Sequence, residues 1–288
     1  MVVDAHHHLW DLDVRDQPWL APQSPLRRDF RPSDLRAAVD GCGVESTVLV
    51  QTVADPDETP EMLVLADTVE RIGAVVGWVD VTARDTRERL GRLLGHPSGH
   101  WLRGVRHPVE FEDDPDWLAR TEVLDGLAAV EDAGLVYELL VRVHQLPAAE
   151  RAVREFPQLR FVLDHCGKPP AAGGDARSWE RGVRRLAEHG NVVGKFSGLV
   201  TETGLAPGAG GEPVAVEDFV AALQPCADVV LDAFGPRRLM FGSDWPVCLL
   251  AADYPGVLAV ADRLTGGLDE GAREALFAGT ARKVYRLG

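Results

Sequence analysis

Three histidines near the start of the chain, in Asp4-Ala5-His6-His7-His8, are the residues best suited to chemistry. Side chains alternate along a strand, so a strand that begins at Met1-Val2-Val3 sends His6 and His8 to the same side. Leu9-Trp10-Asp11 ends the apolar run, which places the pair at the C-terminal end of that strand. Two converging imidazoles indicate a metal site or an acid–base site. A structural histidine pair and a purification-tag remnant are the alternatives, although a tag is a longer run outside the fold.

Other ionisable side chains stand at the ends of further apolar runs. Examples are Val162-Leu163-Asp164-His165 and Phe241-Gly242-Ser243-Asp244. Charged groups and imidazoles in apolar strands are costly unless they are paired, so their recurrence predicts one shared site. Lys195 lies inside such a run, and Glu138 in another run is either its partner or a hydrogen-bonded core acid. The set at these strand ends is Arg106, His107, His144, His165, Lys195 and Asp244, with Trp245 directly after the last.

The residue types in this set suit two kinds of chemistry. Three histidines and one carboxylate favour zinc or manganese, and a metal-bound water of near-neutral pKa attacks a carbonyl. Without a metal, Asp244 deprotonates water while histidine, lysine and arginine donors stabilise the oxyanion. The sequence leaves both open, and a turn-capping role is the structural alternative for Asp244. The candidate metal ligands are His6, His8, His165 and Asp244.

Eight short apolar runs, separated by amphipathic stretches, are expected to position these residues. Stretches such as 31–39 and 59–66 open with residues typical of helix starts. Eight near-continuous strands, each followed mostly by a helix, predict a (β/α)8 barrel, whose active face lies at the carboxyl ends of its strands. A doubly wound sheet is the alternative. The predicted strands are 2–6, 46–51, 74–81, 102–107, 135–143, 160–165, 191–197 and 238–242.

Two long stretches interrupt the alternation of strand and helix. Residues 11–29 contain three prolines, and residues 199–213 are rich in glycine. Long loops at the carboxyl face of a barrel build its substrate pocket, so we interpret both as pocket walls. The second stretch alternatively reads as a linker, but a boundary there leaves a fragment of about 75 residues with too small a core. The sequence therefore predicts a single barrel domain over residues 1–288.

Composition excludes several classes of partner. The formal net charge of −15 argues against binding to nucleic acid or to an anionic membrane, because both require clustered cations. The chain contains no run of about 20 apolar residues that could span a bilayer. Four cysteines without metal-site spacing do not form a disulfide framework. We therefore expect a cytoplasmic protein that acts on a small molecule; homo-oligomerisation is left open.

The ordered strand-end motifs resemble those of the amidohydrolase superfamily, in its branch of small TIM-barrel hydrolases that includes L-fuconolactonases and L-rhamnonolactonases. Single motifs are only moderately specific, but the ordered set runs from end to end of the chain. The matching stretches are Asp4 to Trp10, Gly104 to His107, Val141 to Pro147, Leu163 to Pro169, Lys195 to Glu202 and Phe241 to Pro246.

This resemblance implies a (β/α)8 barrel that hydrolyses a lactone with water as the nucleophile. It implies that Asp244 is the general base, and that His6, His8 and His165 bind either one divalent metal or the substrate carbonyl. Zinc, manganese or no metal at all are the options, and the lack of an evident bridging ligand other than Lys195 or Glu138 argues against two metals. Substrate-binding roles are implied for Arg106, His107, His144 and Lys195, and Trp245, with Trp10 and Trp19, is expected to pack on a sugar ring.

Three other functions remain as alternatives to a sugar lactonase. Hydrolysis of a pyrone dicarboxylate or a muconolactone needs several cations, which Arg106, Arg142 and Lys195 supply. Metal-dependent decarboxylation of an aromatic acid requires a tightly bound metal. A non-catalytic binding protein on the same barrel would not need Asp244 for any measurable activity.

Overall fold

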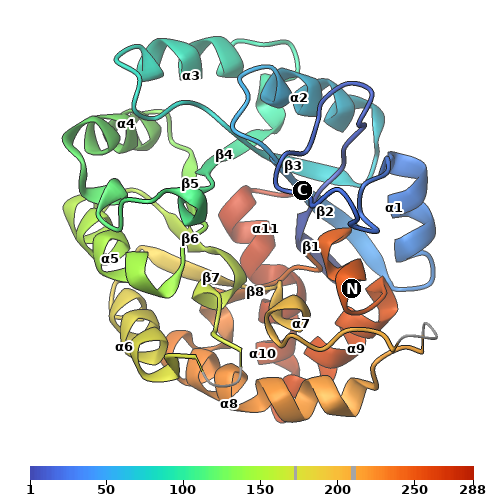
Figure 1. The fold of residues 1–288 in the computed structure, drawn as a ribbon. Coiled ribbons are helices and arrows are strands. Elements are labelled where there is room, and N and C mark those ends of the chain that lie inside the picture. Colours follow the sequence, from blue (N-terminus) through green and yellow to red (C-terminus); the bar gives the residue numbers. More distant parts are fainter. Residues whose placement is uncertain (172–173, 209–211) are drawn as a thin grey trace.

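Eight parallel strands follow one another around a barrel in the computed structural model, which describes residues 1–171, 174–208 and 212–288 (Figure 1). Each strand pairs with the next in the chain. A parallel bridge between His7 and Trp245 brings the end of the last strand back to the first. The strands are β1 (Val2–His7), β2 (Val44–Val50), β3 (Ile72–Gly77), β4 (Leu102–His107), β5 (Val136–Leu139), β6 (Phe161–Leu163), β7 (Val192–Phe196) and β8 (Leu239–Phe241).

Helices surround the strands as an outer ring (Figure 1). Those that follow the strands bury their apolar faces against the barrel, as expected for a (β/α)8 fold. The helices are α1 (Pro32–Val39), α2 (Glu58–Thr68), α3 (Thr86–Leu94), α4 (Thr121–Asp132), α5 (Leu146–Glu155), α6 (Ala176–Ala187), α7 (Leu199–Glu202), α8 (Val216–Phe234), α9 (Tyr254–Leu264), α10 (Glu270–Glu274) and α11 (Thr280–Tyr285).

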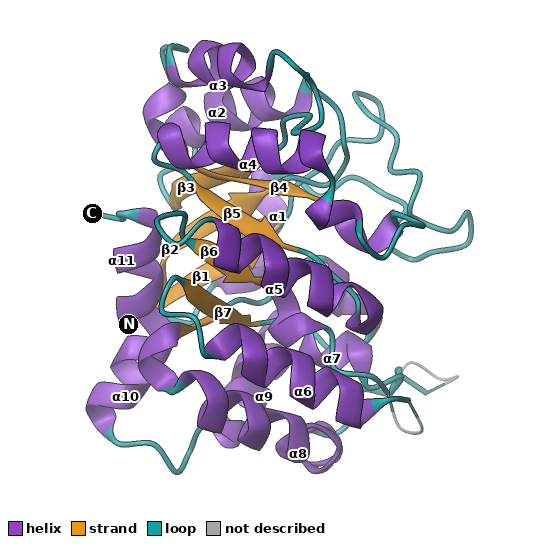
Figure 2. Cartoon of the chain, turned by 90° about the vertical axis from the view of Figure 1, so that its left-hand side faces the viewer, coloured by secondary structure: helices purple, strands orange, loops and turns teal. Residues whose placement is uncertain are grey.

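The barrel has two apolar cores. The larger one lies between the strands and the surrounding helices. The smaller one fills the barrel interior with side chains such as Val48, Val76 and Val162, and Tyr285 of α11 belongs to it. Figure 2 shows α11 and both termini at one end of the barrel and the long loops at the other. The C-terminal helix thus closes the end opposite the carboxyl ends of the strands.

The structure confirms the predicted (β/α)8 barrel and all eight predicted strands. Return of the last strand to the first excludes the doubly wound sheet. The predicted strand 135–143 is too long, because the chain leaves β5 after Leu139 and forms a 3-10 turn at Val143–Gln145. In the loop predicted at 199–213, Leu199–Glu202 form α7, and residues 209–211 lie outside the described part of the chain.

Among the described residues, no helix combines the length and the apolar composition that a bilayer crossing requires.

Candidate active site

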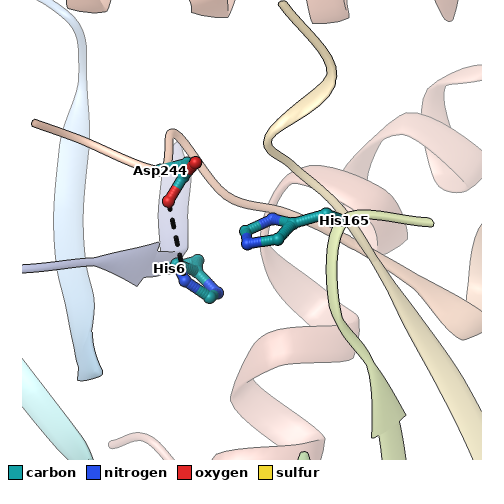
Figure 3. Close-up of side chains that lie close together, drawn as sticks. All are labelled: His6, His165 and Asp244. Carbon is teal, nitrogen blue, oxygen red and sulfur yellow. Dashed lines mark ion pairs between the residues drawn. The ribbon is translucent and has the colours of Figure 1, made fainter. Parts of the chain in front are cut away.

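Four of the predicted residues converge at the carboxyl ends of the strands, and Figure 3 shows three of them, His6, His165 and Asp244. His6 and His8 come from the end of β1, His165 follows β6, and Asp244 follows β8. The Asp244 carboxylate lies 3.7 Å from His6 Nε2 and 3.5 Å from His8 Nε2, and the two Nε2 atoms are 3.2 Å apart. The rings of His6 and His165 lie 4.6 Å apart between centroids. All four residues are buried.

Asp4 fixes the junction of β1 and β8 that carries this group. Its carboxylate accepts hydrogen bonds from the Ser243 backbone N–H at 2.9 Å, the Ser243 hydroxyl at 2.6 Å and the Tyr254 hydroxyl at 2.9 Å. A fourth bond, of 3.1 Å, comes from the His6 backbone N–H. The Asp244 N–H in turn donates to the His6 carbonyl at 2.8 Å. One buried carboxylate therefore holds His6 and Asp244 in a fixed relative position.

The loops after β6 and β8 adopt a backbone conformation that L-residues rarely occupy. His165, Cys166, Lys168 and Asp244 have positive φ angles of 51°, 52°, 52° and 58°. Such conformations are costly and persist where the surrounding structure enforces them, often at functional sites. Here they turn the His165 and Asp244 side chains toward the same point.

Burial and neighbouring charges set the protonation of the group. Burial lowers the pKa of His165 to about 4 and the pKa of His6 well below its ordinary value, so both rings are neutral at pH 7. Burial alone would raise the pKa of Asp244, but the His165 charge and the His8 hydrogen bond outweigh it, and the pKa lies below the usual 3.8. At neutral pH the site holds an ionised carboxylate beside the uncharged imidazoles of His6 and His165, which suits proton abstraction.

The donor atoms fit a single divalent metal ion. His8 Nδ1 donates to the Val50 carbonyl at 2.8 Å, which leaves its Nε2 lone pair facing Asp244. Tetrahedral zinc with nitrogen ligands at about 2.0–2.1 Å places neighbouring ligand atoms about 3.3 Å apart. The measured separations of 3.2, 3.5 and 3.7 Å are close to this spacing. His165 offers one further nitrogen within 4.8 Å of His6 and Asp244 ligand atoms.

Two contacts set a condition on such a metal. Lys195 Nζ lies 3.0 Å from His6 Nδ1. Arg106 Nη1 lies 3.3 Å from His6 Nε2. Because lysine and arginine only donate, both cations compete for the single lone pair of the neutral His6 ring. A metal on His6 Nε2 requires that lone pair to stand on Nε2, which lies 3.2 Å from His8 Nε2.

A fully buried ionic layer lies directly beneath the histidines. Lys195 Nζ contacts Glu138 at 2.5 Å and Asp164 at 3.1 Å, and Arg106 contacts Asp164 at 2.9 Å. The Tyr285 hydroxyl of α11 donates to Glu138. Burial and the nearby Asp164 charge raise the pKa of Glu138 to about 7. The predicted pairing of Lys195 with Glu138 is therefore present, and it places Lys195 under His6 rather than in the cavity.

A cavity of about 250 Å³ opens above Asp244, His8 and His165. Arg106 lines it, and the Arg106 Nε–H has no hydrogen-bond partner within the part of the chain that the structure describes. Trp19 of the loop after β1 also lines it. The lining also includes two acids and two bases, which we term the charged wall: Glu110, Arg142, Lys168 and Glu202.

Three residues predicted to bind substrate lie elsewhere. His107 stacks on Trp117, with ring centroids 4.3 Å apart, and its Nε2 contacts Glu112. His144 is exposed and lines a separate cavity between α5 and α6. Trp245 is buried and packs edge-on against Phe30. The structure therefore does not bring these side chains to the cavity above Asp244.

Trp10 lines a different cavity, of about 430 Å³, beside α1 and α2. That cavity is larger than the one above Asp244, but the converging histidines and Asp244 do not line it.

Sequence reasoning did not assign Glu110, Lys168 or Glu202 to the site. Each follows a predicted strand, but on a loop or short turn whose direction hydrophobic periodicity does not give. Two features of the sequence could have indicated these residues. Glu110 comes three residues after the end of β4, and Lys168 is one of only three lysines in the chain.

Comparison with known proteins places this site in context. A family model described as amidohydrolase matches residues 3–287. An L-fucono-1,5-lactonase of Burkholderia multivorans is 38% identical over 295 residues, which cover 99% of this chain and 96% of that protein. An L-fucono-1,5-lactonase of Burkholderia ambifaria is 36% identical, with 99% and 95% covered. A crystal structure of a Burkholderia multivorans amidohydrolase with bound zinc has a TM-score of 0.90 at 36% identity, with both chains fully covered.

Proposed function

The chain belongs to the amidohydrolase family, and we propose that it opens a sugar lactone of the L-fucono-1,5-lactone class with water as the nucleophile. The similarity to two L-fucono-1,5-lactonases over nearly the whole of both chains supports this substrate class. The observation that carries the proposal is the ionised Asp244 carboxylate, which faces the cavity beside His8 and His165.

Asp244 acts as the general base in this reaction. It accepts a proton from water as the water oxygen bonds to the lactone carbonyl carbon, and a tetrahedral oxyanion forms. The oxyanion then collapses, and the bond from carbon to the ring oxygen breaks. The ring oxygen takes the proton from Asp244 and becomes a hydroxyl group, so the carboxylate is regenerated and the product is a sugar acid.

Arg106 is placed to stabilise the oxyanion. Its guanidinium is fixed by the Gln51 carbonyl at 2.6 Å and by Asp164 at 2.9 Å. Arg106 lines the cavity, which places its positive charge beside the bound carbonyl; its Nε–H has no described partner but is itself buried. A fixed donor in a dry site stabilises developing negative charge more strongly than water does.

A divalent metal, zinc or manganese, would be held by His6, His8, His165 and Asp244. Such an ion would polarise the carbonyl or acidify a bound water. The roles of Asp244 in accepting a proton from water and of Arg106 in binding the carbonyl oxygen do not depend on which divalent metal is bound.

Initial rates of acid release on a panel of sugar lactones, beside a pyrone dicarboxylate, test the proposal. We expect the fastest, stereoselective turnover on a sugar 1,5-lactone, and Asp244→Asn should lower kcat by about 10³-fold or more while circular dichroism stays unchanged. Asp253→Asn is the matched control, because Asp253 is an exposed helix cap and asparagine caps equally well. Turnover of the pyrone alone, or full activity of Asp244→Asn, would contradict the proposal.

A further inference from the structure

The charged wall of the cavity is built from four consecutive strand ends. Glu110 follows β4, Arg142 follows β5, Lys168 follows β6, and Glu202 lies in α7 after β7. The catalytic group comes from the ends of β1, β6 and β8. A substrate bound between them therefore meets the reacting residues on one side and the charged wall on the other.

The four charges of the wall neutralise one another. Glu110 Oε2 lies 2.8 Å from Lys168 Nζ and 2.9 Å from Arg142 Nη2. Lys168 Nζ also lies 3.5 Å from Glu202 Oε1. Two carboxylates thus balance two cations, and the cavity offers no uncompensated positive charge on this side.

The Glu110–Lys168 pair is more shielded than an ordinary surface ion pair, whereas the Arg142 side chain is 50% exposed. The Glu110 side chain is 6% exposed and the Lys168 side chain is 14% exposed. Lys168 also holds a left-handed backbone conformation, with φ of 52°, that aims its side chain at Glu110. A strained lysine that ends on a nearly buried glutamate is unusual for a solvated loop and typical of a binding surface.

Charge-balanced donors and acceptors recognise hydroxyl groups well. Carboxylate oxygens accept from sugar hydroxyls, while the lysine ammonium and the guanidinium donate to them. A carboxylate on the substrate, by contrast, finds both cations already paired and is repelled by Glu110 and Glu202. Repulsion of the wrong ligand is an effective source of specificity.

We propose that the charged wall selects an uncharged, hydroxylated ring and rejects substrates that carry an additional carboxylate on the side away from the reacting carbonyl. This inference deepens the proposed lactonase function and rests on it for the identity of the ring. It assigns Glu110 and Glu202 as the specificity-determining residues, with Lys168 and Arg142 as their counter-charges.

Calorimetric binding of L-galactose and L-galacturonate tests the wall without turnover, since the two rings differ only in whether C6 is a hydroxymethyl group or a carboxylate. We expect the natural chain to prefer L-galactose. Glu202→Gln should shift the affinity ratio toward the uronate by about tenfold, equivalent to about 1.4 kcal/mol. Glu110→Gln should shift it in the same direction, and Lys168→Met in the opposite direction.

Glu150→Gln is the matched control, because Glu150 pairs with Arg185 on the helical ring and does not line this cavity. Its ratio should equal that of the natural chain. The inference would be overturned if the affinity ratio were unchanged in both Glu202→Gln and Glu110→Gln. It would also be overturned if the natural chain preferred the uronate, or if it bound neither sugar. A different result is a protein that shows no lactone turnover while its affinity ratio for the two sugars still responds to the wall charges. That result would refute the proposed lactonase function but support the proposed selectivity of the charged wall.

Discussion

At the scale of single residues, the protonation states of Asp244 and His165 determine how the rate of lactone hydrolysis depends on pH. The two groups share one pocket, yet the protein shifts both pKa values downward, Asp244 below 3.8 and His165 from 6.5 to about 4. Desolvation favours the neutral imidazole, and an imidazole that does gain a proton favours the ionised carboxylate. The Asp244 base is therefore ionised at every pH above the ordinary carboxyl value of 3.8.

We expect kcat/KM to be constant from pH 7 down to pH 5 and to fall, by about tenfold per pH unit, only below the ordinary carboxyl value of 3.8, because a protonated Asp244 no longer accepts a proton from water. Rates on a sugar lactone, corrected for spontaneous hydrolysis, provide the measurement. A fall of kcat/KM centred near pH 6.5 would instead show that the base is a histidine with an ordinary pKa.

Low pH also weakens the fold, so the profile needs a stability control. His165 binds a proton near pH 6.5 when unfolded but near pH 4 when folded. The unfolded state binds more protons between these values, and stability falls as the pH drops through that window. Circular dichroism at each pH separates this loss from the protonation of Asp244.

At the scale of elements, the junction of β1 and β8 determines the geometry of the site. Asp4 does not point with His6, as strict alternation along a strand predicts, because β1 has a register irregularity between Asp4 and His7. The Asp4 carboxylate instead joins β1 to Ser243 and to Tyr254 at the start of α9. The Asp4 carboxylate is fully buried. Burial raises its pKa although the carboxylate accepts four hydrogen bonds, from the Ser243 hydroxyl and N–H, the His6 N–H and the Tyr254 hydroxyl.

We expect Asp4→Asn to lower both stability and activity. The amide NH2 cannot accept, so at least one buried donor loses its partner, at a cost of about 1–3 kcal/mol in the free energy of unfolding. A displaced Ser243 moves the adjacent Asp244, and a misplacement of about 1 Å lowers kcat by about 10²-fold. Urea unfolding and kcat, corrected for the folded fraction, measure the two effects. Unchanged kcat per folded molecule would show that Asp4 is purely structural.

The elements were more predictable from sequence than the cavity was. Continuous runs such as Val192–Phe196 are buried on both faces, so each identified its strand, and strand ends located His165 and Asp244. His144 was misplaced by the overlong strand 135–143, since the chain turns away after β5. Glu202 was missed because its position depends on α7, a short helix inside a glycine-rich loop.

At the scale of the whole molecule, metal binding and folding are coupled. The His6–His8 pair, His165 and Asp244 are far apart in the sequence, and only the closed barrel brings their donor atoms together. The unfolded chain has no such site, so the free energy of metal binding adds to the free energy of unfolding. The zinc-bound crystal structure of the similar Burkholderia multivorans amidohydrolase makes zinc the first ion to test.

We expect the chain to bind one equivalent of zinc, with stabilisation of about 2.7 kcal/mol when free zinc is 100 times its Kd. Elemental analysis gives the stoichiometry, and the rise in Tm between chelated and zinc-loaded protein gives the stabilisation. His8→Gln should abolish the rise, because it removes a nitrogen beside Asp244. His144→Gln should retain it, because His144 is exposed and lies outside this site. A Tm that zinc does not change would contradict the metal site, and lactone turnover by such a protein would assign the carbonyl chemistry to Asp244 and Arg106 alone.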